Sequence, residues 1–104
     1  MSSTNVISLE TAQNWALKWR SNPAHIVKAF LIPQVDITQL MEERDVQDVR
    51  AYVGIDELGN HKLMLVGVTT DGKDLIDYDN GHYIYDYTTT CPQYCDLESP
   101  MIRI

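Results

Sequence analysis

The residues best suited to chemistry in this chain are its two cysteines, in the segment Cys91-Pro92-Gln93-Tyr94-Cys95. Pro92 suits the first position of a helical turn, which would make Cys91 its N-cap, where backbone N–H groups favour a thiolate. The four-residue spacing also allows the two sulfur atoms to form a local disulfide. Three interpretations stay open: two partly buried thiols that hold the tail in place, a redox-responsive disulfide, and a metal site.

A zinc site at these cysteines would need further ligands, because structural zinc is bound by four side chains. His82, Asp86 and Asp96 are the nearest candidates, and none belongs to a second Cys-x-x-Cys or His-x-x-x-His pair. Cys91, Cys95 and His82 are therefore weak metal candidates. A thioredoxin-like site is excluded, because its cysteines are separated by two residues and these are separated by three.

Four tyrosines form a candidate interaction surface. Tyr83, Tyr85 and Tyr87 alternate along the chain and so project from one face of a strand. Tyr78 would lie opposite Tyr83 if Asn80-Gly81 is a two-residue turn. Such a row commonly borders a core, but aromatic residues are also enriched in protein interfaces.

Catalysis has little support in the sequence. The three histidines lie in different segments, and no serine lies in a nucleophile elbow. Asp74, Asp77, Asp79 and Asp86 could supply paired carboxylates, but aspartates near turns are more simply turn formers and solvated charges. We predict that the protein is not an enzyme and has no cofactor.

An amphipathic helix is predicted over residues 8–20. Ser8 is its expected N-cap, and apolar residues follow at three- and four-residue spacing. Trp15 and Trp19 lie on this apolar side, and we predict that both face the core. Asn22-Pro23 ends the helix, because a residue before proline is disfavoured in helical conformation.

Two short elements are predicted to follow. The apolar, β-prone run at residues 25–32 predicts a largely buried strand that ends at Pro33. Asp36, with Gln39 three residues later, predicts the capping box of a short second helix.

A β-hairpin is predicted from residues 49–55 and 62–69, joined by a turn that contains Gly59. If Asp56 pairs with His61, every pair on one face of the hairpin is apolar. These pairs are Val53 with Met64, Ala51 with Val66, and Val49 with Val68. A shift of one residue would move this set to the other face, so the sequence predicts a definite register.

Asp71-Gly72 and Asn80-Gly81 favour tight turns, so further strands are predicted over residues 74–78 and 82–87. Residues 88–104 predict no regular element, and we expect this cysteine-containing tail to lie over the sheet.

The fold class predicted from these elements is α+β. Residues 1–104 are expected to form a single domain, with two helices packed on an antiparallel meander of four to five strands. Residues 1–7 are expected to be disordered.

Charge narrows the choice of partners. Eight Lys and Arg against fifteen Asp and Glu give a net charge of −7, with no basic cluster to bind phosphates. We therefore predict no nucleic-acid partner and, if a protein binds, a basic one. The start of the chain does not resemble a secretory signal, and no apolar run is long enough to span a membrane. The expected location is the cytoplasm, and the oligomeric state stays open.

The second half of the chain resembles short bacterial proteins that carry no assigned function. The similarity rests on Tyr85-Asp86-Tyr87, the Cys-Pro-x-x-Cys-Asp segment at residues 91–96, Ser99-Pro100, and the run at residues 65–68 followed by Asp71-Gly72-Lys73-Asp74. The resemblance implies a small bacterial domain and supplies no catalytic or binding residue.

Two hypotheses on function follow. The acidic charge and the tyrosines favour a non-enzymatic protein-interaction or regulatory domain, for example an immunity-type inhibitor of a basic toxin. The alternative is a thiol redox-responsive or metal-binding protein that uses Cys91 and Cys95.

Overall fold

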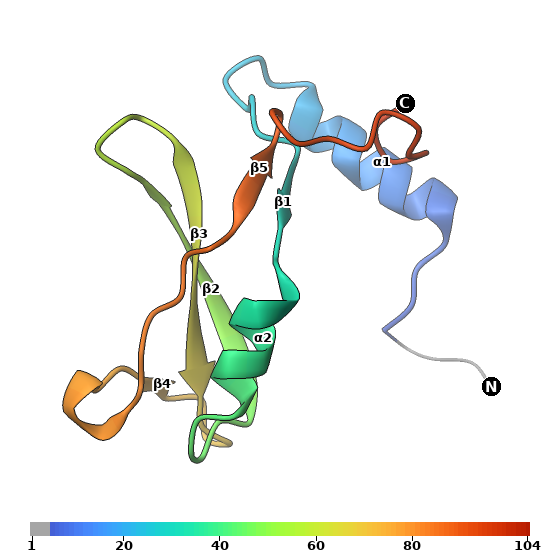
Figure 1. The fold of residues 1–104 in the computed structure, drawn as a ribbon. Helices are drawn as coiled ribbons and strands as arrows, with labels where there is room; N and C mark the ends of the chain where they lie inside the picture. Colours follow the sequence, from blue (N-terminus) through green and yellow to red (C-terminus); the bar gives the residue numbers. More distant parts are fainter. Residues whose placement is uncertain (1–4) are drawn as a thin grey trace.

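The computed structural model describes residues 5–104, which form an α+β fold of two helices and five strands (Figure 1). This confirms the predicted fold class. The helices are α1 (Leu9–Arg20) and α2 (Gln34–Met41). The strands are β1 (Ala29–Leu31), β2 (Asp48–Ile55), β3 (His61–Val68), β4 (Asp74–Leu75) and β5 (Thr89–Cys91). All pairs are antiparallel and form two sheets, β1-β5 and β2-β3-β4.

The N-terminal segment was predicted to be disordered as far as residue 7. Residues 1–4 lie outside the described residues, and residues 5–7 belong to no helix or strand.

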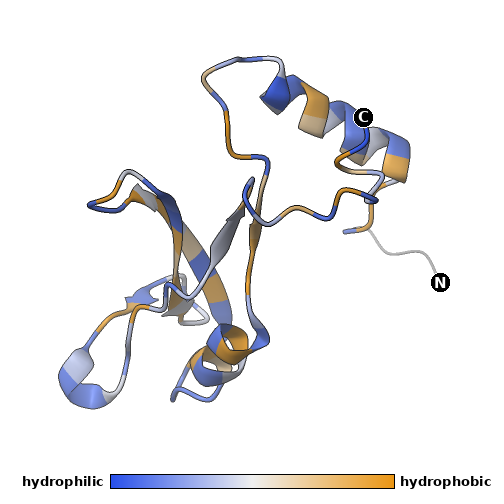
Figure 2. Cartoon of the chain, turned by 45° about the horizontal axis from the view of Figure 1, so that its top comes forward, coloured by the Kyte–Doolittle hydropathy of each residue, from blue (hydrophilic) through white to orange (hydrophobic). Residues whose placement is uncertain are grey.

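Helix α1 begins where the sequence predicts, because the Ser8 hydroxyl accepts a hydrogen bond from the N–H of Thr11 at 3.1 Å. The prediction that its tryptophans face the core is wrong, since Trp15 and Trp19 are both exposed. Figure 1 gives the reason: α1 lies apart from the three-stranded sheet and does not cover it. Figure 2 shows hydrophobic residues on this helix and on the segment that leads into β1.

Strand β1 is shorter and more exposed than predicted. Of residues 25–32, only Ala29–Leu31 are in a strand, because their partner β5 has only three residues. Ala29 and Leu31 are exposed, so the prediction of a largely buried strand is wrong.

Helix α2 begins earlier than predicted, and the proposed capping box is wrong. Pro33 occupies the N-cap position, and Asp36 lies inside the first turn. Asp36 is buried, and its carboxylate accepts a hydrogen bond from the N–H of Tyr87 at 3.0 Å. A contact distant in sequence therefore uses the side chain that was expected to cap the helix.

The β2–β3 hairpin has almost the predicted extent, but the predicted register is wrong by one residue. Asp56 pairs with Asn60 instead of His61: the N–H of Asp56 donates to the Asn60 carbonyl at 2.9 Å. The N–H of Gly59 donates back to the Asp56 carbonyl at 3.0 Å, and Gly59 has a φ of 84°. This is a turn whose left-handed glycine forms a bulge, and the bulge shifts all later pairs by one residue.

With the observed register, the cross-strand pairs on the two faces of the hairpin differ from those predicted. One face pairs Val49 with Gly67, Ala51 with Leu65, Val53 with Leu63, and Ile55 with His61. The other face pairs Asp48 with Val68, Arg50 with Val66, Tyr52 with Met64, and Gly54 with Lys62.

The core is small, and part of it lies between α2 and β3, which pack together. Among the described residues, the buried hydrophobic side chains are Leu40, Leu65, Val66, Val68 and Cys91. The segment that follows α2 lies over the Gly67 face of the sheet, because the Val46 side chain is next to Gly67.

The region after β4 is less regular than predicted. Residues 74–78 contribute only the two-residue β4, and a 3₁₀ turn, η1, covers Tyr78–Asn80. Residues 82–87 contribute two isolated bridges, Asp77 with His82 and Leu65 with Tyr85. Gly81 ends η1 in the left-handed region, so Asn80-Gly81 is part of a four-residue turn, not the two-residue turn predicted.

Candidate functional site

The structure brings three of the four predicted tyrosines together. The rings of Tyr78 and Tyr83 have centroids 5.2 Å apart, and those of Tyr83 and Tyr85 are 6.4 Å apart; both pairs meet at 82°. Edge-to-face contacts of this kind are favoured between aromatic rings. Tyr87 lies beyond them and is 73% exposed. We call Tyr78, Tyr83, Tyr85 and Tyr87 the tyrosine surface.

Glu43, which follows α2, anchors this surface. The Tyr85 hydroxyl donates a hydrogen bond to the Glu43 carboxylate at 2.5 Å, and the N–H of Tyr83 donates to the same oxygen at 3.2 Å. The backbone of Tyr85 exchanges two hydrogen bonds with Leu65, at 2.8 and 3.0 Å. Burial and Glu43 raise the pKa of Tyr85, so its phenol stays a neutral donor.

Acidic residues lie close to the tyrosines in the sequence. Asp77, Asp79 and Asp86 are exposed, and residues 77–87 contain no Lys or Arg. The Asp77 carboxylate also accepts a hydrogen bond from the Asn80 side chain at 2.6 Å, which helps to hold η1. The segment that carries the tyrosine surface is therefore negatively charged.

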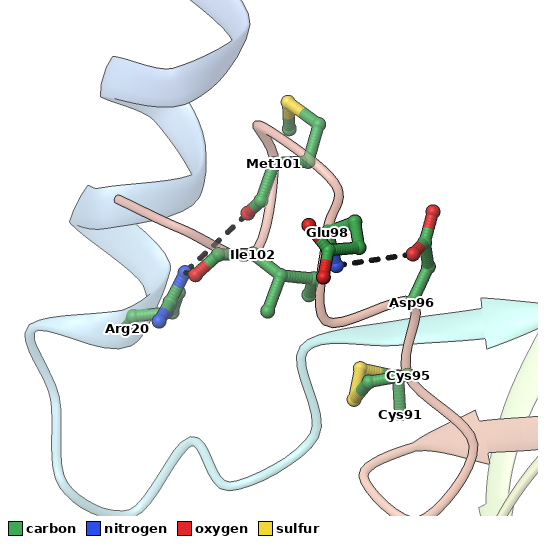
Figure 3. Close-up of a disulfide and its surroundings, with 7 residues drawn as sticks. All are labelled: Arg20, Cys91, Cys95, Asp96, Glu98, Met101 and Ile102. Atoms are coloured by element: carbon green, nitrogen blue, oxygen red, sulfur yellow. Dashed lines mark hydrogen bonds between the residues drawn. A yellow bond between two sulfur atoms is a disulfide. The ribbon is translucent and has the colours of Figure 1, made fainter.

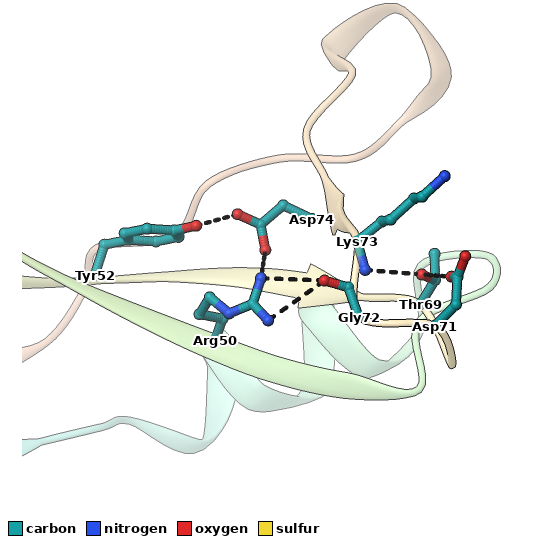
Figure 4. A network of polar contacts seen from close by, with 7 residues as sticks. All are labelled: Arg50, Tyr52, Thr69, Asp71, Gly72, Lys73 and Asp74. Carbon is teal, nitrogen blue, oxygen red and sulfur yellow. Dashed lines mark hydrogen bonds and ion pairs between the residues drawn. The ribbon is translucent and has the colours of Figure 1, made fainter.

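Figure 4 shows a second polar cluster that is absent from the sequence predictions. It lies on the face of the sheet that carries Val66 and Val68, whereas Tyr85 pairs with Leu65 on the opposite face. The Asp74 carboxylate accepts hydrogen bonds from Arg50 and from the Tyr52 hydroxyl. Hydrogen bonding to Asp74 raises the pKa of both Arg50 and Tyr52. Arg50 also donates to the carbonyl of Gly72 at 3.4 Å, so the cluster connects β2 to β4 and the turn before it.

The sequence contained a signal for this cluster. Arg50 and Tyr52 are two residues apart and must share a face of β2. With the correct register that face also carries Val68, which pairs with Asp74. The predicted register, wrong by one residue, placed Val68 on the opposite face from Arg50 and Tyr52, so the cluster was not predicted.

Cys91 and Cys95 form a disulfide, with Cα atoms 4.7 Å apart (Figure 3). Cys91 ends β5 and is buried, so the prediction that it caps a helical turn is wrong. The prediction that residues 88–104 are irregular is also wrong for β5. A short pairing with β1 orders this part of the tail.

The remainder of the tail lies against α1, not over the sheet as predicted. The Arg20 guanidinium donates to the carbonyls of Met101 and Ile102 at 3.4 and 3.3 Å (Figure 3). The Gln13 side chain donates to the carbonyl of Pro100 at 3.0 Å. These bonds join the two ends of the chain.

Two grooves lie near the hairpin tip. One, of about 320 Å³, is largely apolar and includes Trp19, Phe30 and Val53 among its lining residues. Trp19 is held there by a hydrogen bond to the Val27 carbonyl at 2.6 Å and by stacking on His25. The other groove, of about 380 Å³, is more polar and runs between the hairpin turn and residues 88–94.

Comparison with known proteins identifies no relative. No protein-family model matches the chain, and no curated protein or solved structure is significantly similar to it.

The weak metal candidates do not form a cluster. His82 is buried, and its Nε2 lies 3.0 Å from the carbonyl of Arg44, whereas Cys91 pairs with Ala29 in the other sheet. Within residues 5–104 there is no group of three His, Cys, Asp or Glu side chains suited to a metal ion. No helix in the same range is long and apolar enough to cross a membrane.

Proposed function

We propose that the protein is a non-enzymatic protein-interaction domain whose tyrosine surface contacts a basic partner. The observation that carries this proposal is the edge-to-face arrangement of Tyr78, Tyr83 and Tyr85 on the Glu43 anchor. Rings that are already ordered lose little conformational freedom on binding. Tyrosine is also among the residue types that contribute most to binding energy in protein interfaces.

The charge supports a basic partner. Asp77, Asp79 and Asp86 are exposed in the same segment as the rings, and the whole chain carries a net charge of −7. Complementary charge accelerates encounter and disfavours acidic competitors. An immunity-type inhibitor of a basic toxin, in the cytoplasm of a bacterium, is one concrete form of this function.

Photo-crosslinking tests the proposal in the cells that produce the protein. A photoreactive amino acid at Tyr87 is expected to give a covalent product with one discrete basic protein, because Tyr87 is the most exposed member of the tyrosine surface. The same amino acid at Leu97 is the control, because Leu97 is 70% exposed but lies in the tail. It should not give this product.

Calorimetry with the captured protein then tests the role of the rings. Tyr83→Ala is expected to weaken binding about tenfold or more, as for other aromatic anchors. Tyr94→Ala, an exposed tyrosine outside the surface, should leave binding unchanged. The proposal fails if no discrete product forms at Tyr87, or if the two variants bind equally well.

The disulfide favours a second candidate, a thiol redox-responsive protein. Cys91 and Cys95 are four residues apart and bridged, so both partners of a reversible switch are in place. A reducing cytosol normally keeps thiols free. This candidate therefore requires the bridge to open and re-form at the potential of the glutathione pool.

A further inference from the structure

Strand β2 forms one edge of the three-stranded sheet, and its outer backbone groups have no partner among the described residues. Leu65 exchanges both of its hydrogen bonds with Tyr85, so these groups point away from β2. Hydrogen-bonded and non-bonded pairs alternate in an antiparallel ladder. The N–H and C=O groups of Val49, Ala51, Val53 and Ile55 therefore point outward from the sheet.

This edge has few of the features that usually protect an edge strand: Asp48 and Arg50 are charged, but both lie near one end of β2. Natural edges are short or carry proline, lysine or a bulge. β2 has eight residues, contains neither proline nor lysine, and pairs with β3 continuously. Val53 and Ile55, on one face of the strand, are 69% and 68% exposed. The backbone and the apolar side chains thus both favour a further strand here.

The exposed area of the chain is large enough for such a contact. The accessible surface is 7818 Å², whereas a folded monomer of 11.9 kDa exposes about 5,900 Å². Residues 1–4 can account for at most about 600 Å² of this excess, because that is what four extended residues of their mass expose. At least about 1,300 Å² remains over the whole surface, including that of the exposed helix α1, and a stable interface needs about 800 Å² from each partner.

We infer that a second copy of this chain pairs antiparallel with β2, so that the two sheets join into one around a two-fold axis. The net charge of −7 on each copy disfavours self-association, but β2 itself has no net charge, because Asp48 and Arg50 are its only charged residues. With the axis at Ala51, Val49 of each copy lies opposite Val53 of the other. Arg50 then lies opposite Tyr52, which allows a cation–π contact, and no like charges oppose each other.

This interface is separate from the tyrosine surface. Tyr85 lies beyond the opposite edge of β3, on the side where β4 pairs. Dimer formation and partner binding are therefore expected to be independent, so either proposal can be wrong without the other.

Sedimentation velocity at micromolar concentrations tests the dimer. The wild-type chain is expected to sediment at twice its mass of 11.9 kDa. Val53→Lys should weaken dimerisation more than about tenfold, because it places a charge at two equivalent positions of the interface. Leu58→Lys is the matched control: it makes the same change in the hairpin turn, at a residue 86% exposed, and should leave the dimer intact.

Two further measurements separate loss of pairing from loss of folding. Ala51→Pro removes an outward N–H without removing a hydrogen bond to β3 and should also give a monomer, with circular dichroism reporting whether the sheet is retained. In the wild-type dimer, the amides of Ala51 and Val53 should exchange slowly with solvent. A monomeric wild-type chain, a dimer insensitive to Val53→Lys, or fast exchange at these amides would overturn the inference.

Discussion

Gly67 occupies the point on β3 where the segment after α2 lies closest to the sheet. A Cβ atom at this position would be 2.5 Å from Cγ2 of Val46 and 3.3 Å from Cγ1. Val46 is short and β-branched, so its methyl groups have no flexible chain that would let them move away from an added Cβ. Gly67 is therefore required by packing, not by backbone conformation.

Gly67→Ala is expected to lower the free energy of unfolding by roughly 1–3 kcal/mol, the usual cost of overpacking a core. Urea denaturation measures this change. Gly54→Ala is the control, because its Cβ would meet only the terminal Cε of Met64, at 2.9 Å, and that flexible end can move. Equal losses in the two variants would contradict the role assigned to Val46.

At the level of elements, the hairpin depends on Asp56. Its carboxylate accepts hydrogen bonds from the N–H groups of Leu58 at 3.0 Å and Asn60 at 2.8 Å. The backbone hydrogen bond from Asn60 is the main reason that the pKa of Asp56 is lowered from 3.8. A single side chain therefore holds the turn that sets the register of eight cross-strand pairs.

The lowered pKa predicts a pH dependence of stability. A carboxyl whose pKa is lower in the folded state stabilises the fold above its ordinary pKa, and this contribution is lost as the pH falls through the folded-state value. Asp56→Asn keeps one acceptor oxygen but does not titrate. The wild-type protein should be more stable than Asp56→Asn at neutral pH, and the difference should shrink once the pH falls below 3.8.

Urea denaturation at a series of pH values measures this difference. Glu57→Gln is the control, because it removes a charge from the same turn without removing the Asp56 acceptor. A difference between wild type and Asp56→Asn that is constant with pH would contradict the explanation.

At the scale of the whole molecule, the chain is open and flat. Its radius of gyration is 16.0 Å, compared with about 13 Å for a compact chain of this length. The buried apolar side chains belong to α2, β3 and β5, whereas α1 contributes none and is bonded to the C-terminal tail. The two regions are expected to differ in stability.

Reduction of the disulfide is expected to affect one region only. The bridge closes a loop of five residues, which corresponds to a stabilisation of roughly 2 kcal/mol. Hydrogen exchange should become faster in α1 and residues 92–104 after reduction, and should stay slow in β3. Faster exchange in β3 would show that the bridge supports the whole fold. The oxidised fraction in glutathione buffers, measured on the same samples, decides whether the bridge can act as a redox switch.

Local sequence was sufficient for the elements whose stabilising contacts lie within a few residues. The Ser8 cap, the start of α1 and the existence of the β2–β3 hairpin all depend on side chains at close spacing, and all were predicted. The antiparallel α+β class followed from the same spacing.

Tertiary contacts determined the features that depend on residues distant in sequence. Asp36 was predicted to cap α2, but its partner is Tyr87, 51 residues away. Tryptophan periodicity correctly predicted an amphipathic helix, but periodicity does not specify whether another element covers it. The observed register differs from the predicted one because the bulge at Gly59 adds one residue, and the side-chain pattern does not indicate a bulge. With that register, Arg50 meets Asp74, and the strand order of the sheet leaves β2 at one edge.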